Sequence, residues 1–163
     1  RPVVFGLAGP AILVDQPTRS LHTLKDDGVE FVLTDLSQEE HDQYYLHYAN
    51  SVLWPVFHYR LDIASFDSDA FQTYVSVNQR IANMVADRLR EGDSVWVHDY
   101  HFLLMGDSLR RAGWDGPIGF FLHIPFPPPE MFRALPDHLW IARAMCKYSV
   151  IGFQSEQDRS NFT

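Results

Sequence analysis

The clearest pattern of hydrophobic and polar positions lies in the second half of the chain, where short apolar runs alternate with segments of helical periodicity. Strands are expected at residues 94–98, 117–123 and 148–153, and helices at residues 102–112, 136–147 and after Ser155. Strands and helices that alternate at this spacing form βαβ units around a parallel sheet. The strands are apolar along most of their length, as expected for a sheet that is covered on both faces.

A helix is also expected near residue 40. Ser37 is followed by Gln-Glu-Glu, which is an N-cap signal with acidic residues in the first turn. The helix should therefore begin at Gln38 and run toward Asn50. Pro55 is expected to end any helical continuation, because proline lacks the N–H that a helix interior needs.

The rest of the first half predicts one more helix and two strands. The helix should begin at residues 68–69 and end at Gly92, and its apolar residues recur at spacings of three and four. Residues 29–34 are rich in β-branched side chains and predict a strand. Residues 3–7 predict a short strand, broken by Gly6, Gly9 and Pro10.

Length and charge narrow the class of protein. The chain has 163 residues, which suits one domain or one lobe of a larger enzyme. Its formal net charge of −8 argues against a nucleic-acid partner, which would need a basic face. No run approaches the ~18 apolar residues of a membrane helix, so no membrane partner is expected. The chain starts without Met or a signal-peptide pattern and stops inside an expected helix, so we expect a piece of a longer chain.

The single cysteine, Cys146, gives an expectation about the compartment. A lone thiol cannot form an intrachain disulfide and is typical of a reducing compartment, so we expect a cytoplasmic protein. Cys146 lies within the apolar helical pattern of residues 136–147. This position favours a small buried core residue over a nucleophile.

Polar side chains gather where the expected strands of the second half end. The sequences at these ends are His98-Asp99-Tyr100-His101, His123-Ile124-Pro125 and Gln154-Ser155. Open parallel sheets bind ligands beyond the carboxyl ends of their strands. A carboxylate such as Asp99 can accept hydrogen bonds from neighbouring sugar hydroxyls, and His123 can contact a hydroxyl beside a reacting carbon. This edge of the sheet is therefore the expected binding site.

Two interpretations compete for the histidines around Asp99. His98 and His101 are three positions apart and, with Asp99, have the ligand types of a metal site. The second histidine falls where the chain turns into a helix, which disfavours convergence of the two rings. The favoured alternative is structural: His98 hydrogen-bonds the loop, His101 is also structural, and only Asp99 faces the cleft. The alternative for His123 is a core histidine that bonds a carbonyl.

The segment from Tyr44 to Arg60 is dense in aromatic residues. Core packing explains several of them. Tyr and Trp also offer a flat apolar face with a polar tip, on which sugars stack. Arg60 has two interpretations of equal weight, a phosphate ligand and a partner in a structural ion pair.

An ordered set of motifs then resembles a known family. The motifs are Tyr44-Tyr45, Ser51-Val52-Leu53-Trp54-Pro55, Phe57-His58-Tyr59-Arg60, Val97-His98-Asp99-Tyr100-His101, Gly119-Phe120-Phe121-Leu122-His123-Ile124-Pro125-Phe126-Pro127 and Gly152-Phe153-Gln154. In this order and spacing, from about residue 36 to the end, the chain resembles the trehalose-6-phosphate synthases, which are retaining GT-B glycosyltransferases of family 20.

The resemblance implies a fold and an activity. The fold would be α/β, a Rossmann-like parallel sheet flanked by helices, and residues 1–163 would form an incomplete N-terminal, acceptor-side lobe. The activity implied is transfer of glucose from UDP-glucose to glucose 6-phosphate with retention, in trehalose biosynthesis, with no metal or other cofactor. The partners implied are these small molecules, and the resemblance allows a homo-oligomeric parent.

The resemblance also implies roles for individual residues. Tyr45, Trp54 and Asp99 would bind glucose 6-phosphate, and Trp54 and Ile124 would select the anomer. His123 would contact a hydroxyl of the transferred glucose, and Asp99 and His123 would be the catalytic residues. The leaving UDP would deprotonate the incoming hydroxyl, so catalysis would rest on positioning and charge stabilisation.

The chain departs from the family pattern in two places. A tryptophan-rich family segment aligns with residues 4–9, where both tryptophans are replaced. The C-terminal donor-binding lobe is missing, so we expect residues 1–163 to be inactive on their own. The alternative functions are a relative that uses glycerol 3-phosphate, as in a glucosylglycerol-phosphate synthase, a non-catalytic domain that binds sugar phosphate, and a metal-dependent hydrolase.

Overall fold

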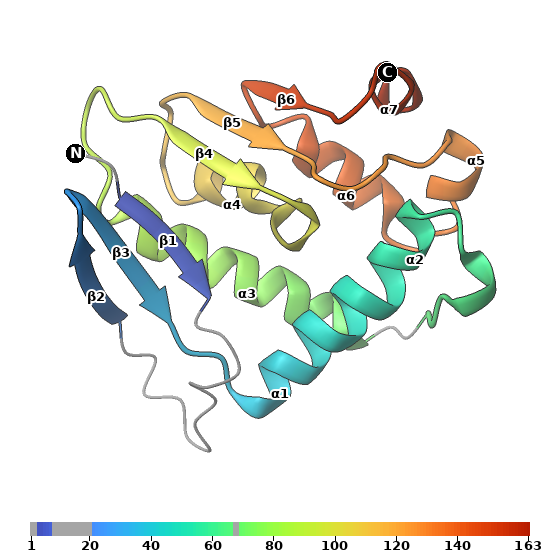
Figure 1. The fold of residues 1–163 in the computed structure, drawn as a ribbon, viewed down its shortest axis with the longest axis horizontal. Coiled ribbons are helices and arrows are strands. Elements are labelled where there is room, and N and C mark those ends of the chain that lie inside the picture. Colours follow the sequence, from blue (N-terminus) through green and yellow to red (C-terminus); the bar gives the residue numbers. More distant parts are fainter. Residues whose placement is uncertain (1–2, 8–20, 67–68) are drawn as a thin grey trace. The chain divides into compact units, whose positions relative to one another are not determined.

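A computed structural model describes residues 3–7, 21–66 and 69–163 (Figure 1). The chain divides into two compact units, Arg1–Asp42 and Gln43–Thr163. The sequence expectations for Gly9, Pro10 and Ser68 lie outside the described residues.

The first unit contains a mixed three-stranded sheet. Its strands are β1 (Val3–Leu7), β2 (Leu21–Asp26) and β3 (Val29–Thr34), in the order β1-β3-β2. Strand β1 runs parallel to β3, and β2 runs antiparallel to it. Both predicted strands of this region are confirmed, and β2 was not predicted. The expected break at Gly6 is wrong, because Gly6 pairs with Leu33 within the ladder of β1 and β3.

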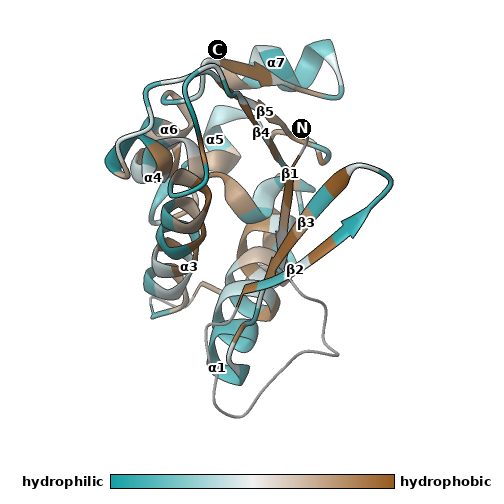
Figure 2. Cartoon of the chain, turned by 90° about the vertical axis from the view of Figure 1, so that its left-hand side faces the viewer, coloured by the Kyte–Doolittle hydropathy of each residue, from teal (hydrophilic) through white to brown (hydrophobic). Residues whose placement is uncertain are grey.

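The turn between β2 and β3 explains the additional strand. Asp27 and Gly28 both have positive φ angles, of 44° and 79°. This conformation is typical of two-residue hairpins, and it favours an Asp-Gly pair. Every residue of β2 is exposed, and Figure 2 shows the strand as largely hydrophilic. Strand β2 therefore lacks the apolar alternation that identifies a half-buried strand in a sequence.

A helical run begins at the predicted N-cap. The Ser37 side chain accepts a hydrogen bond from the backbone of Glu40, whose side chain in turn accepts from the Ser37 backbone. The run consists of α1 (Gln38–Glu40), the π-helix η2 (His41–Leu53) and α2 (Trp54–Phe57). The predicted stop at Pro55 is wrong, because Pro55 lies in the first turn of α2, where its missing N–H has little cost.

The second unit contains the predicted parallel sheet. Strands β4 (Val95–His98), β5 (Ile118–Phe121) and β6 (Val150–Gly152) are all parallel, in the order β4-β5-β6. Besides α2 and most of η2, the unit contains η3 (Leu61–Ile63), α3 (Asp69–Ala86), η4 (Tyr100–Phe102), α4 (Met105–Arg111), α5 (Pro129–Phe132), α6 (His138–Met145) and α7 (Glu156–Phe162). The α/β alternation expected from residue 94 onward is confirmed.

The two faces of this sheet differ in character. Val97, Ile118 and Phe120 are buried on the face that α4 and α6 cover (Figure 1). Trp96 is exposed on the other face, and it lies across Gly119, where a Cβ atom would collide with the indole ring. His98 follows Trp96 on this second face, because side chains two apart in a strand point the same way.

Two expectations about helix ends are wrong. Helix α3 ends at Ala86, where the next residues switch to tighter turns, with Arg88 N bonded to Val85 O and Leu89 N to Ala86 O. Gly92 instead lies in the turn before β4, with a φ of +90°. Cys146 is exposed rather than buried, because α6 ends at Met145 and Cys146 is its C-cap.

No helix in the described residues has the length and apolar character needed to cross a membrane.

Candidate functional site

Asp99 has an unusual backbone conformation at the end of β4. Its φ of 71° and ψ of 169° lie in a region that is favourable essentially only for glycine. Hydrogen bonds hold it there: its N–H donates to the Phe121 carbonyl at 2.9 Å, and its carbonyl accepts from Phe102 N at 3.0 Å. Such strain costs on the order of 1–3 kcal/mol and is concentrated at functional sites.

The Asp99 carboxylate joins two strand ends. Its Oδ1 accepts hydrogen bonds from the backbone N–H of Tyr100 at 3.0 Å and of His123 at 3.2 Å. Among the residues that the structure describes, none donates a hydrogen bond to Oδ2. One carboxylate oxygen therefore positions the backbone, and the other is available to accept hydrogen bonds from a ligand.

His98 and His123 meet across β4 and β5. His98 Nδ1 and His123 Nε2 are 2.9 Å apart, and the ring centroids are 5.1 Å apart. The expected bond from His98 to the loop is therefore wrong, because its Nδ1 is bonded to the other ring. The core interpretation of His123 is also wrong, since His123 is exposed. Gln154 Nε2 donates to the His123 carbonyl at 3.2 Å, so hydrogen bonds link all three strand ends.

The two adjacent tyrosines of η2 have opposite roles. Tyr44 is fully buried, and its hydroxyl donates to the His101 carbonyl at 3.0 Å. Tyr45 is 37% exposed, and its ring stacks on the His101 ring with centroids 5.4 Å apart and planes at 13°. Tyr45 is thus held beside the loop that follows Asp99.

His101 is buried beside Asp99, and its surroundings favour the neutral ring. Burial lowers the pKa of His101 below its ordinary value, against an opposing effect of the Asp99 carboxylate. Its Nε2 is buried and has no hydrogen-bond partner among the described residues. Within the same residues, no group of three or more His, Cys, Asp or Glu side chains is placed to hold a metal ion.

Trp54 and Ile124 lie on segments that flank Asp99 and His123, but no described contact joins either side chain to that of Asp99. Trp54 is 38% exposed and stacks on His58, with ring centroids 3.9 Å apart. Trp54 belongs to α2, and Phe57 of the same helix packs against Phe126, in the segment after His123. The two ring centroids are 5.4 Å apart. Ile124 is half-buried directly after His123.

Arg60 forms an ion pair. Its Nε and a terminal nitrogen donate to the two carboxylate oxygens of Asp62, both at 2.8 Å. The pair is exposed, and the hydrogen bonds and charge of Asp62 raise the pKa of Arg60. Of the two interpretations of Arg60, the structure supports the ion pair.

Three buried tyrosines support η4, a role that was not predicted from the sequence. Tyr74 on α3 donates to the Tyr100 carbonyl at 2.6 Å, Tyr44 to the His101 carbonyl at 3.0 Å, and Tyr148 to the Phe102 carbonyl at 2.6 Å. Three buried hydroxyls therefore bind three successive carbonyls just after Asp99. Periodicity places Tyr74 in the core, but it contains no information about the partner of its hydroxyl.

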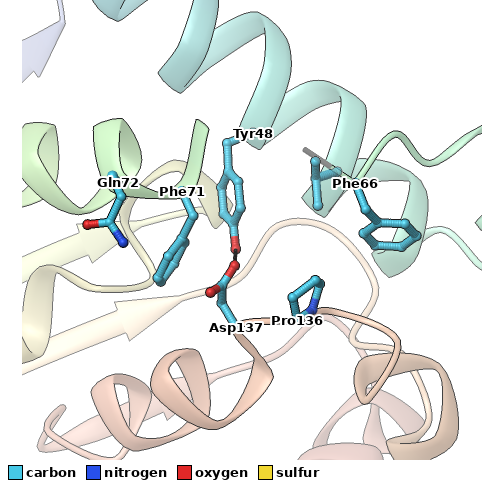
Figure 3. A pocket seen from close by; sticks show the side chains of 7 residues that line it. Tyr48, Phe66, Phe71, Gln72, Pro136 and Asp137 are labelled. Carbon is cyan, nitrogen blue, oxygen red and sulfur yellow. Dashed lines mark hydrogen bonds between the residues drawn. The ribbon is translucent and has the colours of Figure 1, made fainter. Parts of the chain in front are cut away.

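A pocket of about 310 Å³ lies apart from these residues, between η2, α3 and the start of α6. Figure 3 shows Tyr48 and Asp137 pointing toward each other in it, and Tyr48 donates to Asp137 at 3.4 Å. Burial raises the pKa of Asp137, against the opposing effect of this hydrogen bond. None of the predicted site residues lines the pocket, so the strand ends remain the candidate site.

The glycosyltransferase family 20 model matches residues 4–163, which is nearly the whole chain. A curated trehalose-6-phosphate synthase from Cronobacter sakazakii is 42% identical over 158 residues, which are 97% of this chain and 33% of that protein. The chain spans about a third of the length of the curated relatives it matches.

Solved structures agree with this family match. A Burkholderia xenovorans alpha,alpha-trehalose-phosphate synthase (UDP-forming) in complex with glucose-6-phosphate gives a TM-score of 0.94 at 37% identity, over 98% of this chain and 35% of that chain. An E. coli structure bound with UDP-2-fluoro glucose gives a TM-score of 0.91 at 41% identity, over 98% and 35%. The similarity confirms the predicted fold, a Rossmann-like α/β arrangement of a GT-B glycosyltransferase.

Proposed function

Because the chain belongs to glycosyltransferase family 20, we propose that the intact protein transfers glucose from UDP-glucose to glucose 6-phosphate with retention. In this proposal residues 1–163 form the N-terminal, acceptor-side lobe, and the donor-binding lobe lies elsewhere in the intact protein. The observation that carries the proposal is the Asp99 carboxylate, which is held by strained backbone at converging strand ends and has one oxygen without a described partner.

Asp99 is the main acceptor ligand in this account. Its Oδ2 would accept hydrogen bonds from hydroxyls of glucose 6-phosphate, and charge makes such bonds stronger than neutral ones. Because Oδ1 is already bonded to the backbone of Tyr100 and His123, the carboxylate cannot rotate freely. The site is therefore preorganised, which reduces the entropy lost when the acceptor binds.

Tyr45, Trp54 and Ile124 would shape the rest of the acceptor site. Tyr45, supported by the His101 ring, and Trp54, supported by the His58 ring, are partly exposed aromatic side chains with fixed faces. Such faces suit the apolar side of a sugar ring, and the Tyr45 hydroxyl suits a polar group beside it. Trp54 and Ile124 would select the anomer by shape.

His123 would contact the transferred glucose. It is exposed at the end of β5, and its backbone is held by Asp99 on one side and Gln154 on the other. In the proposed step, the anomeric oxygen of glucose 6-phosphate bonds to C1 of the donor glucose while the bond from C1 to the UDP oxygen breaks. The departing phosphate oxygen takes the acceptor's proton, so no carboxylate nucleophile, metal or other cofactor is required.

The proposal extends to the setting of the intact protein. A single cysteine supports a reducing compartment, so we place the protein in the cytoplasm. Its partners would be the two small-molecule substrates, and the proposal allows a homo-oligomer. The negative net charge supports a protein without a nucleic-acid partner.

An acceptor competition tests the proposal. The intact protein would be incubated with UDP-glucose and equal concentrations of glucose 6-phosphate and glycerol 3-phosphate, and the products identified by NMR. We expect trehalose 6-phosphate with the donor's α configuration retained. Preferential formation of glucosylglycerol phosphate would instead support the second acceptor, and release of neither product would contradict the proposed transfer.

A further inference from the structure

His98 lies outside the residues that the proposed function uses, yet its ring is bonded to one of them. His98 Nδ1 and His123 Nε2 are 2.9 Å apart, between two neighbouring strands. Resting on the proposed function, we propose that His98 is a positioning residue that fixes the ring orientation and the tautomer of His123 toward the transferred sugar.

The sheet register brings the two rings together. His98 is paired with Phe121 in the parallel ladder, and His123 follows Phe121 by two residues. Aromatic rings flank the pair. The ring centroids of Trp96 and His98 are 6.3 Å apart, and those of Phe121 and His123 are 4.8 Å apart. The two histidines therefore form the polar centre of an aromatic row on one face of the sheet.

The backbone and the ring of His123 are held by different groups. Asp99 Oδ1 accepts from the His123 N–H, and Gln154 donates to the His123 carbonyl. Neither contact restrains rotation of the side chain. Among the described residues, His98 is the one that hydrogen-bonds the His123 ring, whereas the Phe121 ring packs against it without a polar bond. The directional restraint on the ring therefore comes from His98.

The hydrogen bond also couples the protons of the two rings. A neutral imidazole has one N–H and one acceptor nitrogen, and a bond between two rings needs one of each. If His123 Nε2 donates to His98, the remaining ring nitrogen, Nδ1, accepts from a sugar hydroxyl; if Nε2 accepts, Nδ1 donates, so the role of Nδ1 depends on the tautomer of His98. A partner that fixes the tautomer of a functional histidine in this way is a general device of active sites.

Two substitutions separate positioning from packing. His98→Asn keeps an amide group near the position of Nδ1, so a hydrogen bond to His123 can form. His98→Phe keeps the ring and its contact with Trp96 but removes the hydrogen bond. Both changes are at an exposed side chain, so neither creates a cavity in the core.

Steady-state kinetics of the intact protein give the first readout. We expect His98→Phe to lower kcat by about tenfold or more, because misplacement of a reacting group is costly, with the KM for glucose 6-phosphate unchanged. His98→Asn should restore most of the lost kcat. An unchanged kcat in His98→Phe, or equal losses in both variants, would overturn the proposal.

A His123→Ala background provides the second readout. If His98 acts through His123, His98→Phe should cause no further loss of kcat in that background. A loss of the same size as in the wild type would show that His98 acts independently, which contradicts the proposal.

The ring tautomer gives a readout that does not depend on activity. In protein labelled with ¹⁵N-histidine, the His123 ring should show one fixed tautomer in the wild type and an average of two in His98→Phe. If wild-type protein transfers no glucose, the proposed function fails and this spectrum alone decides the role of His98. An averaged tautomer in the wild type would overturn the positioning role.

Discussion

The buried tyrosines that bind η4 and the side chains at the ends of β4 and β5 both hold the segment around Asp99, but they use their polar atoms differently. The hydroxyls of Tyr44, Tyr74 and Tyr148 all bind backbone carbonyls of η4. Asp99, by contrast, uses one carboxylate oxygen for the backbone and has no described partner on the other. The tyrosines thus position the loop, and the strand ends keep capacity for a ligand.

The protonation of the tyrosines agrees with this division. Burial raises the pKa of Tyr44, Tyr74 and Tyr148, so all three remain hydrogen-bond donors at ordinary pH. A change in the tyrosines should therefore reduce stability, and a change at the strand ends should reduce activity. Each prediction below tests whether the two effects can be separated.

The largest effect is expected from Asp99→Asn. The amide oxygen of Asn can still accept from Tyr100 N and His123 N, and Asn has the same size and branching as Asp, so the backbone strain at this position should change little. The lost charge should lower kcat/KM for glucose 6-phosphate by about 100-fold or more, because each hydrogen bond to a charged group contributes about 1.5–3 kcal/mol. Kinetics and the thermal unfolding midpoint of the intact protein would be measured together. A variant that loses stability instead of activity would place Asp99 with the structural residues.

Tyr74→Phe should have the largest effect on stability. It removes the donor to the Tyr100 carbonyl and the acceptor for the Leu103 N–H, both in a buried region. Because these buried groups lose their partners, the free energy of unfolding should fall by about 2 kcal/mol or more. Denaturant unfolding should show this loss as a lower midpoint.

Tyr48→Phe is the matched control. Tyr48 is as deeply buried, but its 3.4 Å bond to Asp137 is long, so its loss should cost clearly less. Equal losses in the two variants would contradict the importance of the η4 carbonyl bonds.

Alkaline pH should weaken the same region. Burial, with a smaller effect of the Asp99 charge, raises the pKa of Tyr100 to about 12. Between about pH 10 and 12 the unfolded chain loses tyrosine protons that the folded chain retains. Stability that is present below about pH 10 should therefore be lost as the pH rises through 12. Thermal unfolding across this range should show a steep decline in the wild type and a shallower one in Tyr100→Phe, and identical slopes would contradict the assignment.

The smallest effect is expected from Arg60→Ala. Arg60 is paired with Asp62 on an exposed surface, where such pairs contribute little. We expect no measurable change in the unfolding midpoint and a KM for glucose 6-phosphate within about twofold of the wild type. A large rise in that KM would restore the phosphate-binding interpretation of Arg60.

Local patterns were sufficient to predict much of the fold. The N-cap at Ser37, the parallel pairing of β4, β5 and β6, and the helix start at Ser155 are confirmed. Strand β2 could have been predicted from Asp27-Gly28 alone, since that pair favours a hairpin turn. The stop at Pro55 was wrong because the cost of a proline depends on whether its missing N–H is needed.

The site was only partly predictable, because its key contacts join distant residues. The strand-end rule identified Asp99 and His123, and neither the Asp99 strain nor the bond between His98 and His123 is visible in the sequence. The same limit applies to the hydroxyls of Tyr44, Tyr74 and Tyr148, which bind a loop that is 26 to 57 positions away. Periodicity predicts which residues are buried, but their partners depend on tertiary packing.

Calorimetry on the intact protein tests the central claim, that these strand ends bind the acceptor. Glucose 6-phosphate and UDP would each be titrated into the wild type and into Asp99→Asn. We predict that the variant loses binding of glucose 6-phosphate while it binds UDP as the wild type does. Wild-type affinity of Asp99→Asn for glucose 6-phosphate would contradict the account.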